Sequence, residues 1–301
     1  MADVIQNYSS SDFHRLADFY GRTAKHATIL GNSYTEFLIQ KFKRPGYDPT
    51  KNLFVAEKKK KLIGYADLVY EEQIKRAIAD IFVFSPYRHQ GLGGELMDLL
   101  LRRSRDIQAA TFHVNVPEFD QTASFFLSEQ KFSFIRNFLT LKMDISKKLF
   151  LDWDFEHIVL KSFKTGEEED LAALQNKIFS GSWGFCPNTV EETRYYLQLT
   201  GCRIKEVICI EDKGRKIGYV WHHKLPKTNG RRIHMFGVDP AFRGRGLGKK
   251  LIQTAIYQMG KLGIKTVELT VDSENVPAVS LYNSLGFKLE SRSVWYEKPI
   301  T

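Results

Sequence analysis

Two patterns of apolar and polar residues alternate along the chain, and each predicts a different element. Short runs rich in β-branched and aromatic residues, such as Leu62 to Val69, are typical of strands. Stretches in which apolar residues return every three or four positions, as from Leu247 to Met259, are typical of amphipathic helices. The order of these patterns predicts β-α-α-β-β-β-α-β-α-β, and it occurs twice.

The expected elements can be given by range. The first half should contain strands at Val4 to Asn7, Leu53 to Ala56, Leu62 to Val69, Ala77 to Phe84 and Thr111 to Val116, and helices at Asp12 to Tyr20 and Tyr34 to Lys43. The second half should contain strands at His157 to Lys161, Val207 to Ile210, Ile217 to His223, Ile233 to Val238 and Thr266 to Val271, and helices at Glu167 to Phe179 and Thr189 to Leu199. A short helix and a final strand should complete each half.

The two halves are copies of one another. With a shift of 155 residues, the stretch from Arg88 to Phe132 falls without a gap on the stretch from Arg243 to Phe287. With a shift of 154 residues, Ile63-Gly64-Tyr65 meets Ile217-Gly218-Tyr219. A tandem duplication of this length predicts two domains. We place them at residues 1–147 and 156–301, with the joint near Ile145 to Glu156.

A loop rich in glycine and basic residues follows the same strand in each half. It reads Arg-x-x-Gly-x-Gly at 88–93 and again at 243–248. Neither the Walker loop nor the dinucleotide fingerprint has this spacing. Glycines let successive N–H groups approach an anion at the positive end of a helix dipole. One copy would also fit a tight turn with a helix cap, but two copies favour a pyrophosphate site.

Composition and charge limit the classes of function that the sequence supports. Apolar residues make up 43% and charged residues 26% of the chain, which is ordinary for a globular protein. The net charge of +9 favours anionic partners without choosing among them. The one dense basic run, Lys58 to Lys61, lies between two predicted strands and is expected to be a solvated hairpin turn. The sequence contains no stripe of basic residues with interleaved aromatic ones, so it does not indicate nucleic-acid binding.

Cysteine use and hydropathy argue against other classes. Cys186, Cys202 and Cys209 are odd in number and form no CxxC pair, so neither a disulfide framework nor a metal site is expected. No run approaches the roughly 18 apolar residues of a membrane span. The first residues lack the layout of a secretory signal. We therefore expect a cytoplasmic protein with no membrane partner.

Both loops resemble the signature Gln/Arg-x-x-Gly-x-Gly/Ala of the GNAT superfamily of N-acetyltransferases. The second half also carries the lead-in Val238-Asp239-Pro240 and the downstream pattern that includes Asn275, Tyr282 and Gly286-Phe287. Among tandem members, the layout resembles that of mycothiol synthase, helped by the stretch at 181–192. The resemblance implies an α/β (α+β) fold of two GNAT-like domains, each with a mixed, mostly antiparallel sheet and helices on both faces.

The resemblance implies acetyl transfer from acetyl-CoA, or another short acyl-CoA, to an amine. The pyrophosphate would lie on the glycine loop, and backbone N–H groups near Phe236 to Val238 would polarise the thioester carbonyl, with Gly237 suiting a β-bulge. The implied cofactor-binding residues are Phe236, Gly237, Val238, Arg243, Gly244, Arg245, Gly246, Leu247, Gly248, Lys249 and Asn275, with Val83, Arg88, His89, Gln90, Gly91, Leu92, Gly93 and Gly94 in the first half.

The resemblance also implies a general acid. The departing thiolate needs a proton, and Tyr282 holds the family's position for its donor. A shift of 155 residues places Leu127 at that position in the first half, and Asp120 at the position of Asn275. Leucine cannot donate a proton, so we expect only the second half to be catalytic. The alternative is that Tyr282 is an aromatic residue of the core with no role in catalysis.

The general base is less clearly marked. Where mycothiol synthase-like proteins carry a glutamate, this chain has Arg232, which cannot accept a proton at neutral pH. His234 follows on the same strand face and has a suitable reference pKa. His222, His223 and Glu268 are the alternatives. The departure at Arg232 puts the mycothiol precursor in doubt as the acceptor.

The acceptor itself is predicted only as a class. We expect a small-molecule or peptide amine, bound by the first helices and the late loops, which include Ser182 to Asn188 and the region after Phe287. Trp183, Phe185 and Trp295 would either line that pocket or pack in the core. A non-catalytic acyl-CoA-binding or regulatory protein is the alternative function. Both a monomer and a homodimer fit the sequence.

Overall fold

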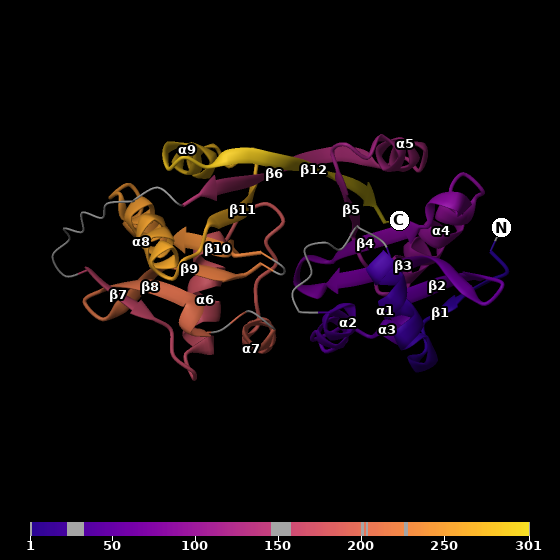
Figure 1. Ribbon diagram of the computed structural model, residues 1–301, viewed down its shortest axis with the longest axis horizontal. Coiled ribbons are helices and arrows are strands. Elements are labelled where there is room, and N and C mark those ends of the chain that lie inside the picture. The colour runs from indigo at the N-terminus through magenta and orange to yellow at the C-terminus, as the bar shows by residue number, and fades with distance from the viewer. Residues whose placement is uncertain are drawn as a thin grey trace. The chain divides into compact units, whose positions relative to one another are not determined.

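The strands and helices follow the predicted order (Figure 1). The computed structural model describes residues 2–22, 33–145, 158–199, 202, 204–225 and 228–300. The expected joint therefore lies outside the described residues, apart from Ile145. The strands are β1 (Val4–Asn7), β2 (Leu53–Lys58), β3 (Lys61–Glu71), β4 (Arg76–Val83), β5 (Thr111–Pro117), β6 (Ser133–Asp144), β7 (Ile158–Ser162), β8 (Val207–Asp212), β9 (Arg215–Lys224), β10 (Gly230–Val238), β11 (Thr266–Asp272) and β12 (Lys288–Pro299).

The helices match the predicted stretches, except for the short helix α3, which was not predicted from the sequence. Short 3₁₀ turns occur beside them, two of which, at Ser85–Tyr87 and Pro240–Phe242, lead into the glycine loops. The helices are α1 (Phe13–Arg22), α2 (Tyr34–Phe42), α3 (Pro49–Asn52), α4 (Leu92–Asp106), α5 (Gln121–Glu129), α6 (Glu168–Phe179), α7 (Val190–Gln198), α8 (Leu247–Lys261) and α9 (Val276–Ser284).

The chain forms two units, and each contains a set of neighbouring strands of mixed direction. The first unit comprises Met1–Arg136 and Ser293–Thr301, and the second comprises Asn137–Arg292. The sheet order is β1-β2-β3-β4-β5-β12 in the first unit and β7-β8-β9-β10-β11-β6 in the second. Only β4 with β5 and β10 with β11 pair in parallel; the other recorded pairs are antiparallel. The predicted mixed, mostly antiparallel sheets are confirmed.

Alternating side chains place an apolar core on each face of the first sheet. On β2, Phe54 and Ala56 pack with α4, whereas Leu53 and Val55 pack with α1 and α2. The strand needs both sets to be apolar, because successive residues point to opposite faces. In the second unit, α8 and α9 cover one face and α6 lies against the other. Helices therefore cover both faces, as predicted.

The last strand of each half was predicted to complete its own half, and this prediction is wrong. From Ser293 onwards β12 pairs with β5, and Val294, opposite Val116, is buried in the core of the first unit. Conversely, β6 pairs with β11, and its Leu141 and Met143 belong to the core of the second unit. Both strands are twelve residues long. The alternation of apolar and polar residues within a strand does not specify which half of the chain supplies its pairing partner.

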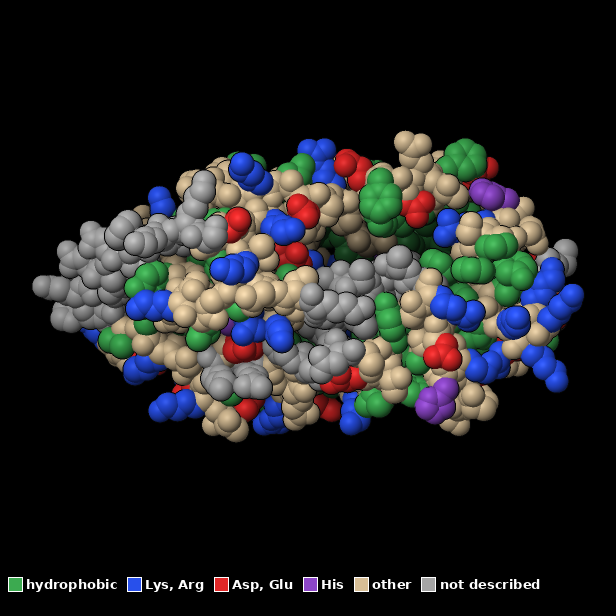
Figure 2. All heavy atoms as spheres, in the orientation of Figure 1, with side chains coloured by type: hydrophobic (Ala, Val, Ile, Leu, Met, Phe, Trp, Pro, Cys, Tyr) green, Lys and Arg blue, Asp and Glu red, His purple; other side chains and the backbone are tan. Residues whose placement is uncertain are grey.

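The dense basic run is a hairpin turn, as predicted. β2 ends at Lys58 and β3 begins at Lys61. Lys59 and Lys60 are exposed and have φ values of 48° and 61°. On the face shown in Figure 2, Lys and Arg side chains are interspersed with apolar and acidic ones.

β10 contains a bulge, but at His234 rather than at Gly237, which corrects the sequence interpretation. Ile233 lies opposite His222 and Met235 opposite Trp221, so His234 is the extra residue. Gly237 has a different role. A Cβ atom there would lie 2.4 Å from Ile178 Cγ2, so glycine permits the close approach of α6 to the strand.

We expect Val294→Asp to destabilise the first unit by about 3 kcal/mol or more, because it places a carboxyl group in an apolar core. In full-length Val294→Asp, hydrogen exchange should be faster for the amides of α4 and α5 than for the amides of α8. Leu289→Asp is the control on the same strand, since Leu289 is 48% exposed. Unchanged protection of α4 in Val294→Asp would show that β12 does not complete this sheet.

We expect Gly237→Ala to cost about 1–3 kcal/mol in the free energy of unfolding, because the added methyl group overlaps Ile178. Denaturant unfolding measures this. Gly260→Ala is the control: Gly260 lies in α8 with nothing within 4 Å of an added Cβ. It should be neutral or stabilising by up to about 1 kcal/mol. Equal stabilities of the two variants would contradict the close packing of α6.

Candidate active site

In the second unit, the parallel strands β10 and β11 separate partway along their length. Their pairing ends with Ile233 opposite Leu269, although β10 continues to Val238. Beyond that point β10 stays paired with β9, and β11 with β6. The end of β10 therefore has no strand partner on its β11 side among the described residues. Backbone groups of Phe236, Gly237 and Val238 lie on this segment.

The first unit repeats this opening. β4 pairs with β5 only as far as Ala79 opposite Val114, while β4 continues to Val83. In both units, the glycine loop follows the strand that loses its partner. An extended molecule with an amide-rich chain and an anionic end can therefore pair with the strand and reach the loop.

The glycine loops present helix N-termini. Gly246 and Gly91 are the N-cap residues of α8 and α4, with φ values of 76° and 87°. This left-handed conformation favours glycine, and an added Cβ at Gly246 would meet nothing within 4 Å. Because the first N–H groups of a helix lack intrahelical acceptors, both loops suit a bound phosphate. Leu247 and Leu92 point into the cores, so they contribute only backbone groups to this face.

The arginine that opens each motif stabilises its loop. Arg243 donates from Nε to the Val238 carbonyl oxygen at 3.0 Å and from Nη2 to that of Ile178 at 2.8 Å. Arg88 donates from Nε to the Val83 carbonyl oxygen at 3.0 Å. These side chains tie the loop to the end of the preceding strand.

Other cations remain exposed at the second loop. The Arg245 and Arg215 guanidinium groups lie 5.3 Å and 5.8 Å from the centroid of the Phe242 ring. Arg245 and Lys249 are exposed. Sequence reasoning missed Arg215, because it lies on the β8–β9 hairpin outside the motif. Arg215 also forms an ion pair with Asp239, whereas Arg245 and Lys249 add positive charge that suits a phosphate.

Tyr282 of α9 packs beside the unpaired end of β10. Its ring centroid lies 6.3 Å from that of Phe236 and 5.7 Å from that of Phe287. The side chain is 6% exposed, and burial raises the pKa of its phenol well above the usual value. The phenol therefore stays protonated at neutral pH. Leu127, at the same position in the repeat, is buried in the apolar core of the first unit.

Asn275 and Asp120 play the same structural part in their units. The Asn275 side chain accepts from the Ala278 N–H at 3.2 Å and caps α9. Asp120 accepts from the Ala123 N–H at 3.0 Å and caps α5. The substitution between the halves thus preserves the N-cap.

His234 lies among three other rings. Its ring centroid is 5.3 Å from that of Trp221, 5.9 Å from that of His223 and 6.0 Å from that of Tyr196. His234 is open to solvent, but loss of hydration among these rings and the charge of Arg232 lower its pKa to about 4. Its imidazole is thus neutral at neutral pH and has a free electron pair, but the lowered pKa makes it a weaker base than an ordinary histidine.

The alternative bases are less available. Glu268 Oε1 accepts from Arg232 Nε at 2.7 Å, so this carboxylate forms an ion pair. His222 and His223 are each only 6% exposed, and burial lowers the pKa of both, as it does that of His234, so exposure and not pKa separates these histidines. Among the candidates, His234 combines exposure with a position at the strand opening.

The loop at 182–188 packs against the second unit's own helices. Asn188 Nδ2 donates to Gln175 Oε1 at 3.1 Å, and the Asn188 N–H donates to Asn176 Oδ1 at 2.7 Å. Trp183 and Phe185 are half-buried, with ring contacts to Phe138 and Phe179. By contrast, Trp295 belongs to the first unit, where its ring centroid lies 6.1 Å from that of His113.

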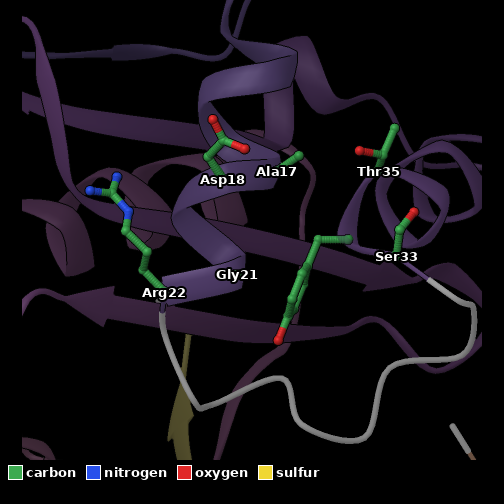
Figure 3. Close-up of a pocket in the computed structure, with 7 residues that line it drawn as sticks. Ala17, Asp18, Gly21, Arg22, Ser33 and Thr35 are labelled. Carbon is green, nitrogen blue, oxygen red and sulfur yellow. The ribbon is translucent and has the colours of Figure 1, made fainter. Parts of the chain in front are cut away.

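The first unit contains a hollow of about 650 Å³ between α1 and the start of α2 (Figure 3). It includes none of the residues that the sequence assigned to catalysis or cofactor binding. Its lining residues are Ala17, Asp18, Gly21, Arg22, Ser33, Tyr34 and Thr35.

The described ranges contain no candidate metal site or membrane-spanning helix. No cluster of three or more His, Cys, Asp or Glu residues there could hold a metal ion. No helix among those residues has the length and apolar character to span a membrane. The three cysteines are free thiols, and burial raises the pKa of Cys209 to about 11, so it is not an activated nucleophile.

Comparisons with known proteins give a consistent result. The sequence profile of the Acetyltransferase (GNAT) family matches residues 17–132 and again residues 169–287. A mycothiol acetyltransferase from Pseudarthrobacter chlorophenolicus is 28% identical over 249 residues, covering 78% of this chain and 74% of the relative. One from Amycolatopsis mediterranei is 26% identical over 251 residues, covering 78% and 80%.

Solved structures share the fold. A GCN5-related N-acetyltransferase from Sphaerobacter thermophilus has a TM-score of 0.76 at 18% identity, covering 99% of this chain and 95% of that one. A tandem GNAT protein from the clavulanic acid biosynthesis pathway has a TM-score of 0.73 at 14% identity, covering 98% and 97%. The resemblance predicted from the two glycine loops is confirmed. This chain belongs to the GNAT family of acetyltransferases and carries the family's domain twice in tandem.

Proposed function

We propose that the second unit transfers an acetyl group from acetyl-CoA to a primary amine of a small molecule or peptide, and that the first unit does not catalyse this reaction. The observation that carries the proposal is the pair Tyr282 and Leu127. Tyr282 places a protonated hydroxyl group beside the unpaired end of β10, whereas Leu127 supplies no proton donor.

The second unit offers a fitting site for acetyl-CoA. The pantetheine amides can pair with the free edge of β10, and the pyrophosphate can bind at the N-terminus of α8. N–H groups of the Phe236 to Val238 segment can stabilise the oxyanion that forms during attack. Arg245 and Lys249 lie exposed at the loop to neutralise the phosphates.

The reaction requires two proton transfers. The amine nitrogen forms a bond to the thioester carbonyl carbon and loses a proton to His234, directly or through water. The carbon–sulfur bond then breaks, and the thiolate takes a proton from the Tyr282 hydroxyl group. Burial raises the pKa of the Tyr282 phenol, which makes it a weaker acid, and the same apolar surroundings raise the pKa of the CoA thiol, which offsets part of the cost of the transfer.

The acceptor is proposed as a class of primary amines. Because relatives are named mycothiol acetyltransferase, cysteinyl sugars related to mycothiol are the first acceptors to test. However, the glutamate expected as base is replaced by Arg232, which is paired with Glu268. A panel that also includes polyamines, amino sugars, aminoglycosides and peptides, assayed with acetyl-CoA for thiol release, identifies the acceptor.

We expect Tyr282→Phe to lower kcat by about 10²–10⁴-fold, because it removes only the hydroxyl group that protonates the thiolate. Isothermal titration should show acetyl-CoA affinity within about twofold of the wild type. Tyr257→Phe is the control, since Tyr257 lies on α8 of the same unit with Lys261 over its ring. Unchanged turnover in Tyr282→Phe would mean that another group serves as the acid.

We expect Gly246→Val to abolish acetyl-CoA binding to the second unit and to eliminate turnover. A β-branched residue cannot readily adopt the φ of 76° that shapes this loop. Gly91→Val meets the same strain, with φ of 87°, in the first unit. It should leave most of the turnover intact.

Titration and turnover of both glycine variants separate binding from catalysis. A folded Gly91→Val protein without activity would show that the first unit takes part in the reaction. Absence of binding heat for the wild type at millimolar acetyl-CoA would overturn the cofactor assignment.

A further inference from the structure

Two carboxylates of the first unit lie directly opposite each other on neighbouring strands. Asp67 of β3 is the cross-strand partner of Asp80 of β4. Asp67 is only 2% exposed, and Asp80 is half-buried. Like charges in this arrangement destabilise a sheet, and loss of water strengthens their repulsion. The pair therefore requires a cation or hydrogen-bond donors.

The chain supplies both kinds of partner. The Lys41 ammonium group, from the last turn of α2, forms an ion pair with Asp67. The Tyr47 hydroxyl donates to Asp67 Oδ1 at 2.6 Å, and the Tyr65 hydroxyl donates to Asp80 Oδ2 at 2.7 Å. These donors satisfy part of the capacity of both carboxylates.

Aromatic rings complete the surroundings of the ammonium group. Lys41 Nζ lies 5.9 Å from the centroids of both the Phe37 and the Tyr47 rings. The face of an aromatic ring attracts a cation, most strongly where water is excluded. A buried carboxylate, tyrosine hydroxyls and ring faces are together the chemistry that recognises a primary ammonium ion.

The cluster lies where the first sheet opens. Ala79 is the last residue of β4 that pairs with β5, and Asp80 directly follows it. In the second unit, the corresponding cross-strand pair is Trp221 opposite Met235, which carries no charge. There the Trp221 ring packs against that of His234, the proposed base. The carboxylate pair is therefore specific to the first unit.

We propose that Asp67 and Asp80 form a binding site for a primary ammonium group, and that Lys41 of the same chain occupies it. The side chain of Lys41 then fills the place that an amine would take beside the opening of β4 and β5. The first unit is closed to an amine acceptor for this reason, independently of the missing acid at Leu127.

Lys41 is not itself an acceptor in this arrangement. Burial alone would lower the pKa of its amine, but the charge of Asp67 outweighs that effect and raises the pKa above the usual value. The nitrogen is therefore an ammonium ion without a free electron pair and cannot attack a thioester. The site holds a cation in place and does not activate it.

Chemical rescue of stability tests this proposal in the full chain. Lys41→Ala should lower the Tm, because it leaves Asp67 buried without its cation. Added butylammonium chloride should recover at least half of the lost Tm, since binding to the folded state alone stabilises it. Butan-1-ol, and sodium chloride at the same ionic strength, should recover little.

Tyr196→Ala is the matched control. Tyr196 lies near the end of α7, the second unit's counterpart of α2, and its ring contacts His234 where no carboxylate pair exists. This variant also creates space beside the sheet, but butylammonium should not raise its Tm. A folded Lys41→Ala protein that does not respond to butylammonium, or responds equally to butan-1-ol, overturns the proposal.

A double variant keeps the test decisive if Lys41→Ala does not fold in buffer. Lys41→Met with Asp67→Asn removes both charges, so it should be less destabilised than the sum of its single changes and should not respond to butylammonium. Refolding of Lys41→Ala with butylammonium, but not with sodium chloride, supports the site. If the double variant folds while Lys41→Ala fails to fold even with the amine, the proposal is overturned. Stability is the readout throughout, so failure here leaves the proposed transfer reaction untouched.

Discussion

The separation of β10 from β11 is the constraint on which the proposed chemistry depends. An interior strand normally pairs on both of its edges, and here the edge of β10 beyond the bulge at His234 lacks a strand partner within the described chain. The bulge allows β10 to stay paired with β9 while it leaves β11. Gly237 then lets α6 approach the freed segment, and Tyr282 packs beside Phe236 on the same segment. Strand, loop and acid are thus held by one local distortion.

The two units show how one fold can support different sites. Both have the strand opening and a left-handed glycine at the start of the next helix. They differ in a few side chains beside that opening. Tyr282, Trp221 and His234 surround it with a phenol and neutral rings in the second unit. In the first unit, the same region holds a buried ion pair and an apolar leucine. The strand order is the same in both units despite these differences.

Most of the fold was predictable from the sequence, because the strands alternate and the helices are amphipathic. The internal repeat allowed each element to be identified twice. The exchange of the last strands was not predictable, since β6 and β12 have the same length and the pairing partner of a strand depends on contacts distant in sequence. The same exchange explains why Trp295 belongs to the first unit, although it lies late in the second repeat.

The site was predictable where backbone conformation dictates residue type, as at Gly246. It was less predictable where a residue has two possible roles. Arg243 reads as a phosphate ligand, but its guanidinium group holds backbone carbonyl oxygens, and Asn275 caps a helix. Arg215 gave no sequence signal, because its position near Phe242 arises only when the hairpin meets the loop.

The exchanged strand also affects the order in which the two units can fold during synthesis. During synthesis the N-terminal segment emerges first, yet the sheet of the first unit lacks β12 until residues 293–299 leave the ribosome. Over that interval β5 presents an open edge, a feature that invites pairing with other chains. The second unit meets no such delay, because β6 precedes all of its other strands. The half proposed to be catalytic can therefore assemble its strands before residues 293–299 complete those of the first unit.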